Sequence, residues 1–246
     1  MEKPVPYKTI FQINYKPELK FYDLLIPSAQ RLDEYPHWRT DVRTVILRDY
    51  DKHCSIIIGH KSFAYEQDSE DTDMEIKYIQ RALEELPSSL QIEIFNRFGY
   101  RRKYLINVKM SFESLVSILH VKLFSQDAKL RNILPPHVED LMYRLDFSDK
   151  PYRYHVTVGP VHKAEMPRYI NYNLENHLDP QVREEEYKKI IENYPKVAVF
   201  IDIDFYQEGD KLKKDESTSF LKTARAKINE FANDLTEYLF NIELEA

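Results

Sequence analysis

Glycine is scarce in this sequence: only Gly59, Gly99, Gly159 and Gly209 occur among 246 residues. Glycine-rich phosphate loops need several glycines at fixed spacing, because the backbone must approach the phosphate closely. Neither GxGxxG nor GxxxxGK[ST] is present. The sequence therefore argues against dinucleotide-binding and P-loop folds, and we expect no cofactor.

Cysteine and long apolar runs are also lacking. Cys54 is the only cysteine, which excludes a disulfide framework and a cysteine zinc cluster. It follows His53, but neighbours on a strand point to opposite faces, so we interpret it as a buried structural thiol. No stretch approaches the roughly 18 apolar residues that cross a bilayer, and residues 1–4 do not resemble a signal peptide. We expect a cytoplasmic protein that does not bind membranes.

An excess of positive charge is missing as well. The chain has 41 acidic against 35 basic residues, for a net charge of −6. A protein that binds nucleic acids in general is usually basic, because the neutralisation of phosphates supplies most of its affinity. Nucleic acid is thus a possible partner that the charge does not favour. In contrast, 18 Tyr and 13 Phe supply enough bulky side chains for a large globular core.

The first half of the sequence is typical of an antiparallel meander with helices. Helices are expected over 18–32 and 73–86, and strands over 9–15, 42–49, 53–59 and 62–66, with separators short enough for hairpins. Segments 90–98 and 104–110 flank Gly99, which predicts either one long bulged strand or a hairpin.

The second half repeats strands and helices less regularly. We expect helices over 111–124, 127–133, 136–145 and 180–193, strands over 152–158 and 197–206, a long irregular segment over 159–180, and a polar turn over 207–216. The irregular segment is long enough to be a candidate binding segment. Apolar residues at steps of three and four predict a long amphipathic helix over 217–240.

These patterns favour an α+β fold, with mainly antiparallel sheet in two similar halves packed against amphipathic helices and a long C-terminal helix. We expect one domain over residues 1–246, possibly built from two intimately packed halves, 1–110 and 111–246. Trp38 is interpreted as an anchor in the core.

Two strands and the last helix resemble a known family. Arg97–Val108 (RFGYRRKYLINV) is similar to an arginine-tyrosine-isoleucine-asparagine strand, and Val199–Asp204 (VFIDID) to a leucine-aspartate-isoleucine-aspartate strand. Together with Ile228 and Phe231 of the last helix, they resemble the sporadically distributed family of uncharacterised prokaryotic proteins of about this length. The order of elements fits nearly the whole chain, although Arg101-Arg102-Lys103 departs from the family pattern. The resemblance implies no catalytic residues, and the family's patchy occurrence implies an accessory or defence role.

Asp202 and Asp204 are two apart on an expected strand, so both side chains leave the same face. Convergent carboxylates are what a metal or phosphoryl site needs, because hard cations bind oxygen ligands. The alternative is one wet face of an antiparallel strand, on which an acidic pair stays solvated. We favour the wet face and expect no metal, with this pair as a weak candidate.

His53-Cys54-Ser55 and His155-Val156-Thr157 are two H-x-[ST] triplets on expected strands. In two-histidine phosphoesterases, one imidazole acts as base and the other as acid, while hydroxyls hold the phosphate. A three-letter pattern arises easily by chance among eight histidines. His53 and His155 are therefore weak catalytic candidates.

The most basic stretch is rich in aromatic residues and consists of Arg97, Arg101, Arg102, Lys103 and Tyr104 with their neighbours. Guanidinium groups bind phosphates and aromatic rings stack on bases, so an anion or an RNA strand could bind there. The favoured alternative is a charged edge strand that discourages aggregation.

Because no catalytic set is complete, a non-catalytic binding or assembly module is the leading hypothesis, with a protein partner or self-association expected. A phosphoesterase or nuclease is the first alternative, using His53 and His155 or a metal at Asp202 and Asp204. Regulatory nucleic-acid binding through Arg97–Tyr104 is the second.

Overall fold

The computed structural model describes residues 3–16, 19–68, 72–124, 138–170, 185, 188 and 191–240. Its strands form one nine-stranded sheet in the order β2-β3-β4-β5-β1-β6-β9-β8-β7, and every neighbouring pair is antiparallel. The strands are β1 (Val5–Tyr15), β2 (His37–Thr40), β3 (Thr44–Asp49), β4 (Cys54–Gly59), β5 (Ser62–Gln67), β6 (Phe95–Asn107), β7 (Tyr143–Asp149), β8 (Tyr152–His162) and β9 (Val197–Leu212).

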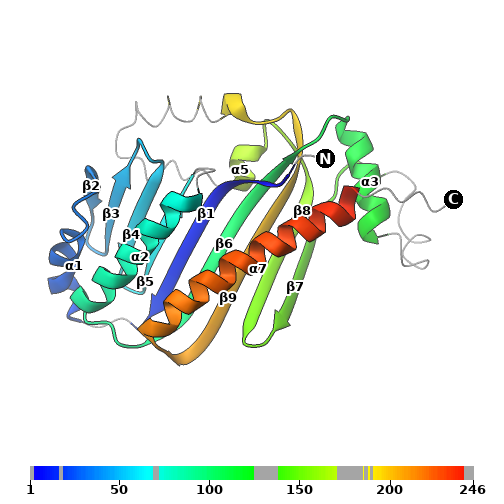
Figure 1. Cartoon of the computed structure of the whole chain (residues 1–246). Helices are drawn as coiled ribbons and strands as arrows, with labels where there is room; N and C mark the ends of the chain where they lie inside the picture. Colours follow the sequence, from blue (N-terminus) through cyan, green and yellow to red (C-terminus); the bar gives the residue numbers. More distant parts are fainter. Residues whose placement is uncertain are drawn as a thin grey trace.

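Helices cover one face of this sheet, as Figure 1 shows. The described helices are α1 (Phe21–Ala29), α2 (Thr72–Ser89), α3 (Phe112–Phe124), α5 (Met166–Ile170) and α7 (Lys214–Phe240). α7 runs diagonally across β6, β9 and β8, while α2 and α1 lie over the other half of the sheet. α3 packs beside β8 and α7. None of the described helices has the length and apolar character needed to cross a membrane.

Alternation along the central strands explains why the helices pack on this face. On β6 and β9 the side chains that face the helices are buried and, apart from Arg102, mostly apolar or aromatic, including Phe98, Tyr100, Ile201, Ile203 and Phe205. α7 meets them with buried side chains at steps of three and four: Phe220, Leu221, Ala224 and Ile228. Burying each large side chain contributes roughly 1.5–3 kcal/mol, so this contact stabilises the centre of the fold. The α+β class with a long C-terminal helix is confirmed.

The strands of both halves of the chain belong to the same sheet. β6 comes from residues 1–110 and β9 from residues 111–246, and they pair over twelve positions from Phe95–Leu212 to Asn107–Ala198. The sheet is therefore continuous across the expected division between the halves.

Several segments differ from the sequence predictions. The helix expected over 136–145 is wrong: from Tyr143 onward the chain forms β7, where Tyr143, Leu145 and Phe147 alternate with polar residues at the period of a strand. The polar turn expected over 207–216 is also wrong, because β9 extends to Leu212 and α7 begins at Lys214. Backbone pairing with β6 and β8 holds residues 207 and 208 in the strand despite their polar side chains.

The two alternatives for 90–110 resolve into one long strand, β6, with a register shift between Phe95 and Arg97. In the expected irregular segment, residues 159–162 continue β8 and Met166–Ile170 form α5. The expected helix over 127–133 and residues 171–180 lie outside the described residues.

Candidate functional site

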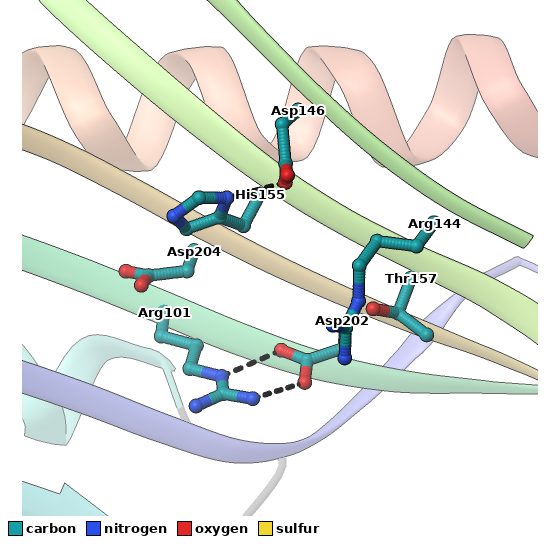
Figure 2. Close-up of a pocket in the computed structure, with 7 residues that line it drawn as sticks. All are labelled: Arg101, Arg144, Asp146, His155, Thr157, Asp202 and Asp204. Carbon is teal, nitrogen blue, oxygen red and sulfur yellow. Dashed lines mark hydrogen bonds and ion pairs between the residues drawn. The ribbon is translucent and has the colours of Figure 1, made fainter.

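The face of the sheet opposite α1, α2 and α7, here called the polar face, carries charged side chains on β6, β9, β8 and β7. They surround a cavity of about 270 Å³, here called the polar hollow. Its lining residues, shown in Figure 2, are Arg101, Arg144, Asp146, His155, Thr157, Asp202 and Asp204.

The two aspartates of β9 are paired with arginines of β6. Arg101 donates from Nε to Asp202 Oδ1 at 2.7 Å and from Nη2 to Oδ2, which makes the pair bidentate. Arg97 Nη2 donates to Asp204 Oδ2 at 3.0 Å. Burial raises the pKa of Asp204, although Arg97 and Arg101 oppose that shift. The aspartates and two arginines of the basic stretch, Arg97 and Arg101, were predicted as separate sites but form one ion-paired cluster.

This pairing weakens the metal hypothesis for Asp202 and Asp204. Each carboxylate already accepts a hydrogen bond from a guanidinium group, and the positive charge of that group would repel a cation bound to the same carboxylate. Within the described residues, no three or more His, Cys, Asp or Glu side chains are placed to hold a metal ion. The alternative, that the pair lies on a solvated face of the strand, does not hold for Asp202 either, since that residue is buried.

His155 is the centre of a hydrogen-bonded chain at the rim of the polar hollow. Its Nδ1 atom bonds to Asp146 of β7, the residue directly opposite it in the sheet. Its Nε2 atom lies 3.1 Å from the hydroxyl of Tyr206 on β9. The Arg97 guanidinium lies 4.6 Å from the centre of the Tyr206 ring, a cation–π contact that connects this chain to Asp204. Both imidazole nitrogens are engaged, so the ring orientation is fixed.

Arg144 and Thr157 differ from the ion-paired residues of the hollow. They face each other across the β7–β8 pair, and both line the cavity. In Figure 2 the Arg144 side chain extends along Thr157 toward Asp202. Neither side chain has a hydrogen-bond or ion-pair partner among the residues that the structure describes. They supply a cationic donor group and a hydroxyl that remain available to a ligand.

The structure does not bring His53 and His155 together. His53 lies in the turn before β4 with a positive φ of 49°. Strands β5, β1, β6 and β9 separate β4 from β8. Five steps of about 4.8 Å put roughly 24 Å of sheet between the two strands. A shared two-histidine site is therefore excluded.

The basic stretch lies on a central strand and divides between the two faces. Arg102 and Tyr104 point under α7, where both donate to Asn229 Oδ1, at 2.9 Å and 3.0 Å. Lys103 points to the polar face and donates to the carbonyls of Tyr169 and Ile170 in α5.

The edge-strand interpretation of this stretch is wrong, because β6 pairs with β1 on one side and β9 on the other. Arg102, Lys103 and Tyr104 are all buried. They are not accessible to a nucleic-acid strand lying on the surface.

The prediction that Cys54 is buried is confirmed, whereas the prediction that Trp38 is buried is wrong. Cys54 is fully buried, and burial raises the pKa of its thiol to about 12, which confirms a structural thiol. Trp38 was predicted in the core, but 67% of it is exposed. The reason is that Trp38 lies on β2, a four-residue strand at the edge of the sheet.

Sequence reasoning missed Arg144, Asp146 and Tyr206. Arg144 and Asp146 fell in a segment predicted as a helix, although alternation of polar and apolar residues over 143–149 indicates a strand. Tyr206 follows Asp204 by two residues, so the same alternation places it on the aspartates' face.

Comparison with known proteins adds little. No family model matches the chain, and no curated protein matches it. Among solved structures, Methanococcus jannaschii TBP aligns over 94% of this chain and 98% of its own, with 11% sequence identity and a TM-score of 0.31. An overall likeness this low carries no functional argument.

Proposed function

We propose that the protein is a non-catalytic binding module, and that the polar hollow recognises an anionic group, a carboxylate or a phosphate, of its ligand. The single observation that carries this proposal is that Arg144 and Thr157 face each other in the hollow without a partner among the described residues. A guanidinium group binds carboxylate and phosphate oxygens in a bidentate fork, and a hydroxyl adds one further donor.

The rest of the hollow supports an anion at this position. Asp202 is neutralised by Arg101 and Asp204 by Arg97, so their repulsion of an incoming anion is small. The strands hold these pairs in place before the ligand arrives, which lowers the entropic cost of binding. Asp146 is bonded to His155, and Figure 2 shows its carboxylate directed toward that ring.

Calorimetric titration with inorganic phosphate and with acetate tests the proposal. We expect saturable binding of at least one of these anions by the native protein and a loss of at least about tenfold in affinity in Arg144→Ala, because the bidentate contact is removed. Arg153→Ala is the matched control: Arg153 is an exposed arginine on the neighbouring strand, paired with Glu208, and lies outside the hollow. Equal affinity in both variants would contradict the proposal.

A second candidate function, hydrolysis of a phosphate ester, is favoured by the chain Asp146–His155–Tyr206. In acid–base catalysis an acidic residue orients the imidazole and the imidazole moves a proton. Tyr206 would be the nucleophile: His155 takes its proton, the tyrosine oxygen bonds to phosphorus, the ester oxygen departs, and water then releases the phosphoryl group from Tyr206. Tyr206 is buried, however, which favours the binding role. His155→Gln should abolish any hydrolysis of a nitrophenyl phosphodiester; unchanged turnover would eliminate this candidate.

We also propose the cytoplasm as the location and an accessory role of the kind that the family resemblance implies. The lone buried thiol of Cys54 needs no oxidising compartment, which supports the location. Fractionation of native cells is the test, and recovery outside the cytoplasm would contradict it.

A further inference from the structure

Exposed apolar side chains gather around α1 and β2. Among the described residues, ten large hydrophobic side chains are exposed, and half of them belong to this one region: Leu19, Tyr22, Ile26, Trp38 and Val42. A groove of about 300 Å³ lies beside them, with Ile26 and Leu32 on its α1 side and Trp38, Thr40 and Leu47 on its strand side. Clustered exposed apolar groups beside a groove are typical of an interaction site.

The groove adjoins the backbone of an edge strand. β2 pairs with β3 on one side, and no described strand pairs with its other side. An edge of this kind presents unpaired N–H and C=O groups that can pair with another extended segment. Trp38 and Thr40 face the groove, whereas His37 and Arg39 alternate with them and point to the polar face. An added strand would meet an apolar groove on one face and Arg39 on the other.

One segment of this chain has the matching pattern. Residues 241–246, which lie outside the described residues, have the sequence NIELEA. In an extended conformation Ile242 and Leu244 point to one side, and Glu243 and Glu245 to the other. The apolar side chains suit the groove, and the glutamates have the charge that complements Arg39. One placement of the segment beside β2 therefore puts the apolar side chains in the groove and the glutamates on the side of Arg39.

The segment cannot reach the groove of its own molecule. The described part of α7 reaches Phe240 beside α3, where the Tyr238 hydroxyl donates to the carbonyl of Lys122. Figure 1 shows this end over the β7–β8 side of the sheet and α1 with β2 at the far side. Seven strand spacings from β8 to β2 amount to about 34 Å, whereas six extended residues span about 20 Å. If residues 241–246 occupy this groove, the segment therefore comes from a second copy.

We propose that residues 241–246 of one copy add as a strand to β2 of a second copy, with Ile242 and Leu244 in the groove and the glutamates toward Arg39. Because the two surfaces differ, the contact is heterologous and generates rings or open chains of molecules. It lies at the opposite end of the sheet from the polar hollow and does not depend on anion binding.

Trp38 makes this contact measurable, because it is the only tryptophan in the chain. Covering its exposed ring should shift its fluorescence to shorter wavelength as protein concentration rises. In the full chain, Leu244→Ser should weaken the association at least about tenfold, because one buried leucine is lost. The matched control is Ile94→Ser, which changes another exposed apolar residue, before β6, and should leave the concentration dependence unchanged.

A synthetic peptide of residues 241–246 with a blocked N-terminus completes the test. It should produce the same saturable shift in the Leu244→Ser protein, and it should bind Arg39→Glu more weakly. Two results would overturn the proposal: a Trp38 emission that responds neither to protein concentration nor to the peptide, or an association that Leu244→Ser leaves unchanged. The variant Arg144→Ala should associate like the native chain, which separates this contact from the proposed anion site.

Discussion

Arg101 on β6 and Asp202 on β9 form a bidentate ion pair across the central strand pair of the polar face. Asp202 is buried, so removing its partner leaves a carboxylate with little access to water. We expect Arg101→Met to lower the free energy of unfolding by about 1–3 kcal/mol, less than for a fully buried pair because Arg101 is partly exposed. Chemical denaturation at neutral pH measures this loss.

Arg153→Met is the control for that loss. Arg153 pairs with Glu208 at 3.4 Å, and both side chains are largely exposed, so the change should cost about 0.5 kcal/mol or less. If both variants lost the same stability, burial of Asp202 would not be the cause.

Asn229 anchors α7 to β6, because its side-chain oxygen accepts hydrogen bonds from both Arg102 and Tyr104. We expect Asn229→Ala to cost about 1–2 kcal/mol, since Arg102 and Tyr104 each lose one acceptor while Asn229 itself is exposed, so water can partly replace its oxygen. Asn229→Asp retains the oxygen and adds a charge that suits Arg102, so it should stay close to the native stability. Thermal and chemical denaturation of the two variants measure this difference.

The matched control is Asn233→Ala, one helical turn further along α7 at an exposed position. It should change stability by no more than about 0.5 kcal/mol. A comparable loss at Asn233 would attribute the effect to helix propensity instead of the contact with β6.

The fold class follows from local patterns, but the site does not. Alternation in VFIDID is enough to place Ile201 and Ile203 in the core and Asp202 on the other face. The partner of Asp202 is beyond such patterns, because Arg101 is 101 residues away and strand order depends on non-local pairing. Sequence alone gives the face of a side chain, whereas its neighbours depend on the register between distant strands.

Trp38 and Lys103 also show that burial cannot be predicted from local sequence: the tryptophan is exposed and the lysine is buried. Composition suggests that a tryptophan is buried and a lysine exposed. The edge position of β2 leaves Trp38 in solvent, and the central position of β6 with α5 above it buries Lys103. Both positions are set by the order of strands, which local periodicity does not encode.

Lys103 should make stability depend on alkaline pH. Burial lowers its pKa to about 8, below the ordinary value of 10.5. Between these values the folded protein has lost the proton that the unfolded chain still binds, so the contribution of Lys103 to stability rises with pH. That contribution is lost again as pH falls through 8. The neutral amine still donates to the carbonyls of Tyr169 and Ile170.

The comparison of native protein with Lys103→Met isolates this contribution, because other titrating groups are common to both. The difference in the free energy of unfolding should shift in favour of the native protein by on the order of 3 kcal/mol from pH 8 to 10.5. Denaturation at several pH values measures it. A difference that stays constant over this range would show that Lys103 titrates normally.

Gly159 on β8 allows the segment before β7 to pass close to the sheet. A Cβ atom at this position would lie 2.7 Å from Met142 Sδ and 2.8 Å from the carbonyl oxygen of Leu141. The backbone oxygen cannot swing away as a side chain can, so Gly159→Ala should cost about 1–3 kcal/mol in unfolding experiments. Gly59→Ala is the control, because its Cβ would lie 3.4 Å from the nearest atom, an ordinary contact, and should be nearly neutral.

The same substitution should also affect the polar hollow. Arg144 follows Met142 by two residues, so a displacement of residues 141 and 142 moves the guanidinium relative to Thr157. If the hollow binds an anion as proposed, Gly159→Ala should weaken phosphate or acetate binding while the protein remains folded, because a bidentate contact tolerates little misplacement. Calorimetric titration alongside the unfolding experiment measures both effects. A destabilised Gly159→Ala protein with native anion affinity would show that β7 does not position the ligand.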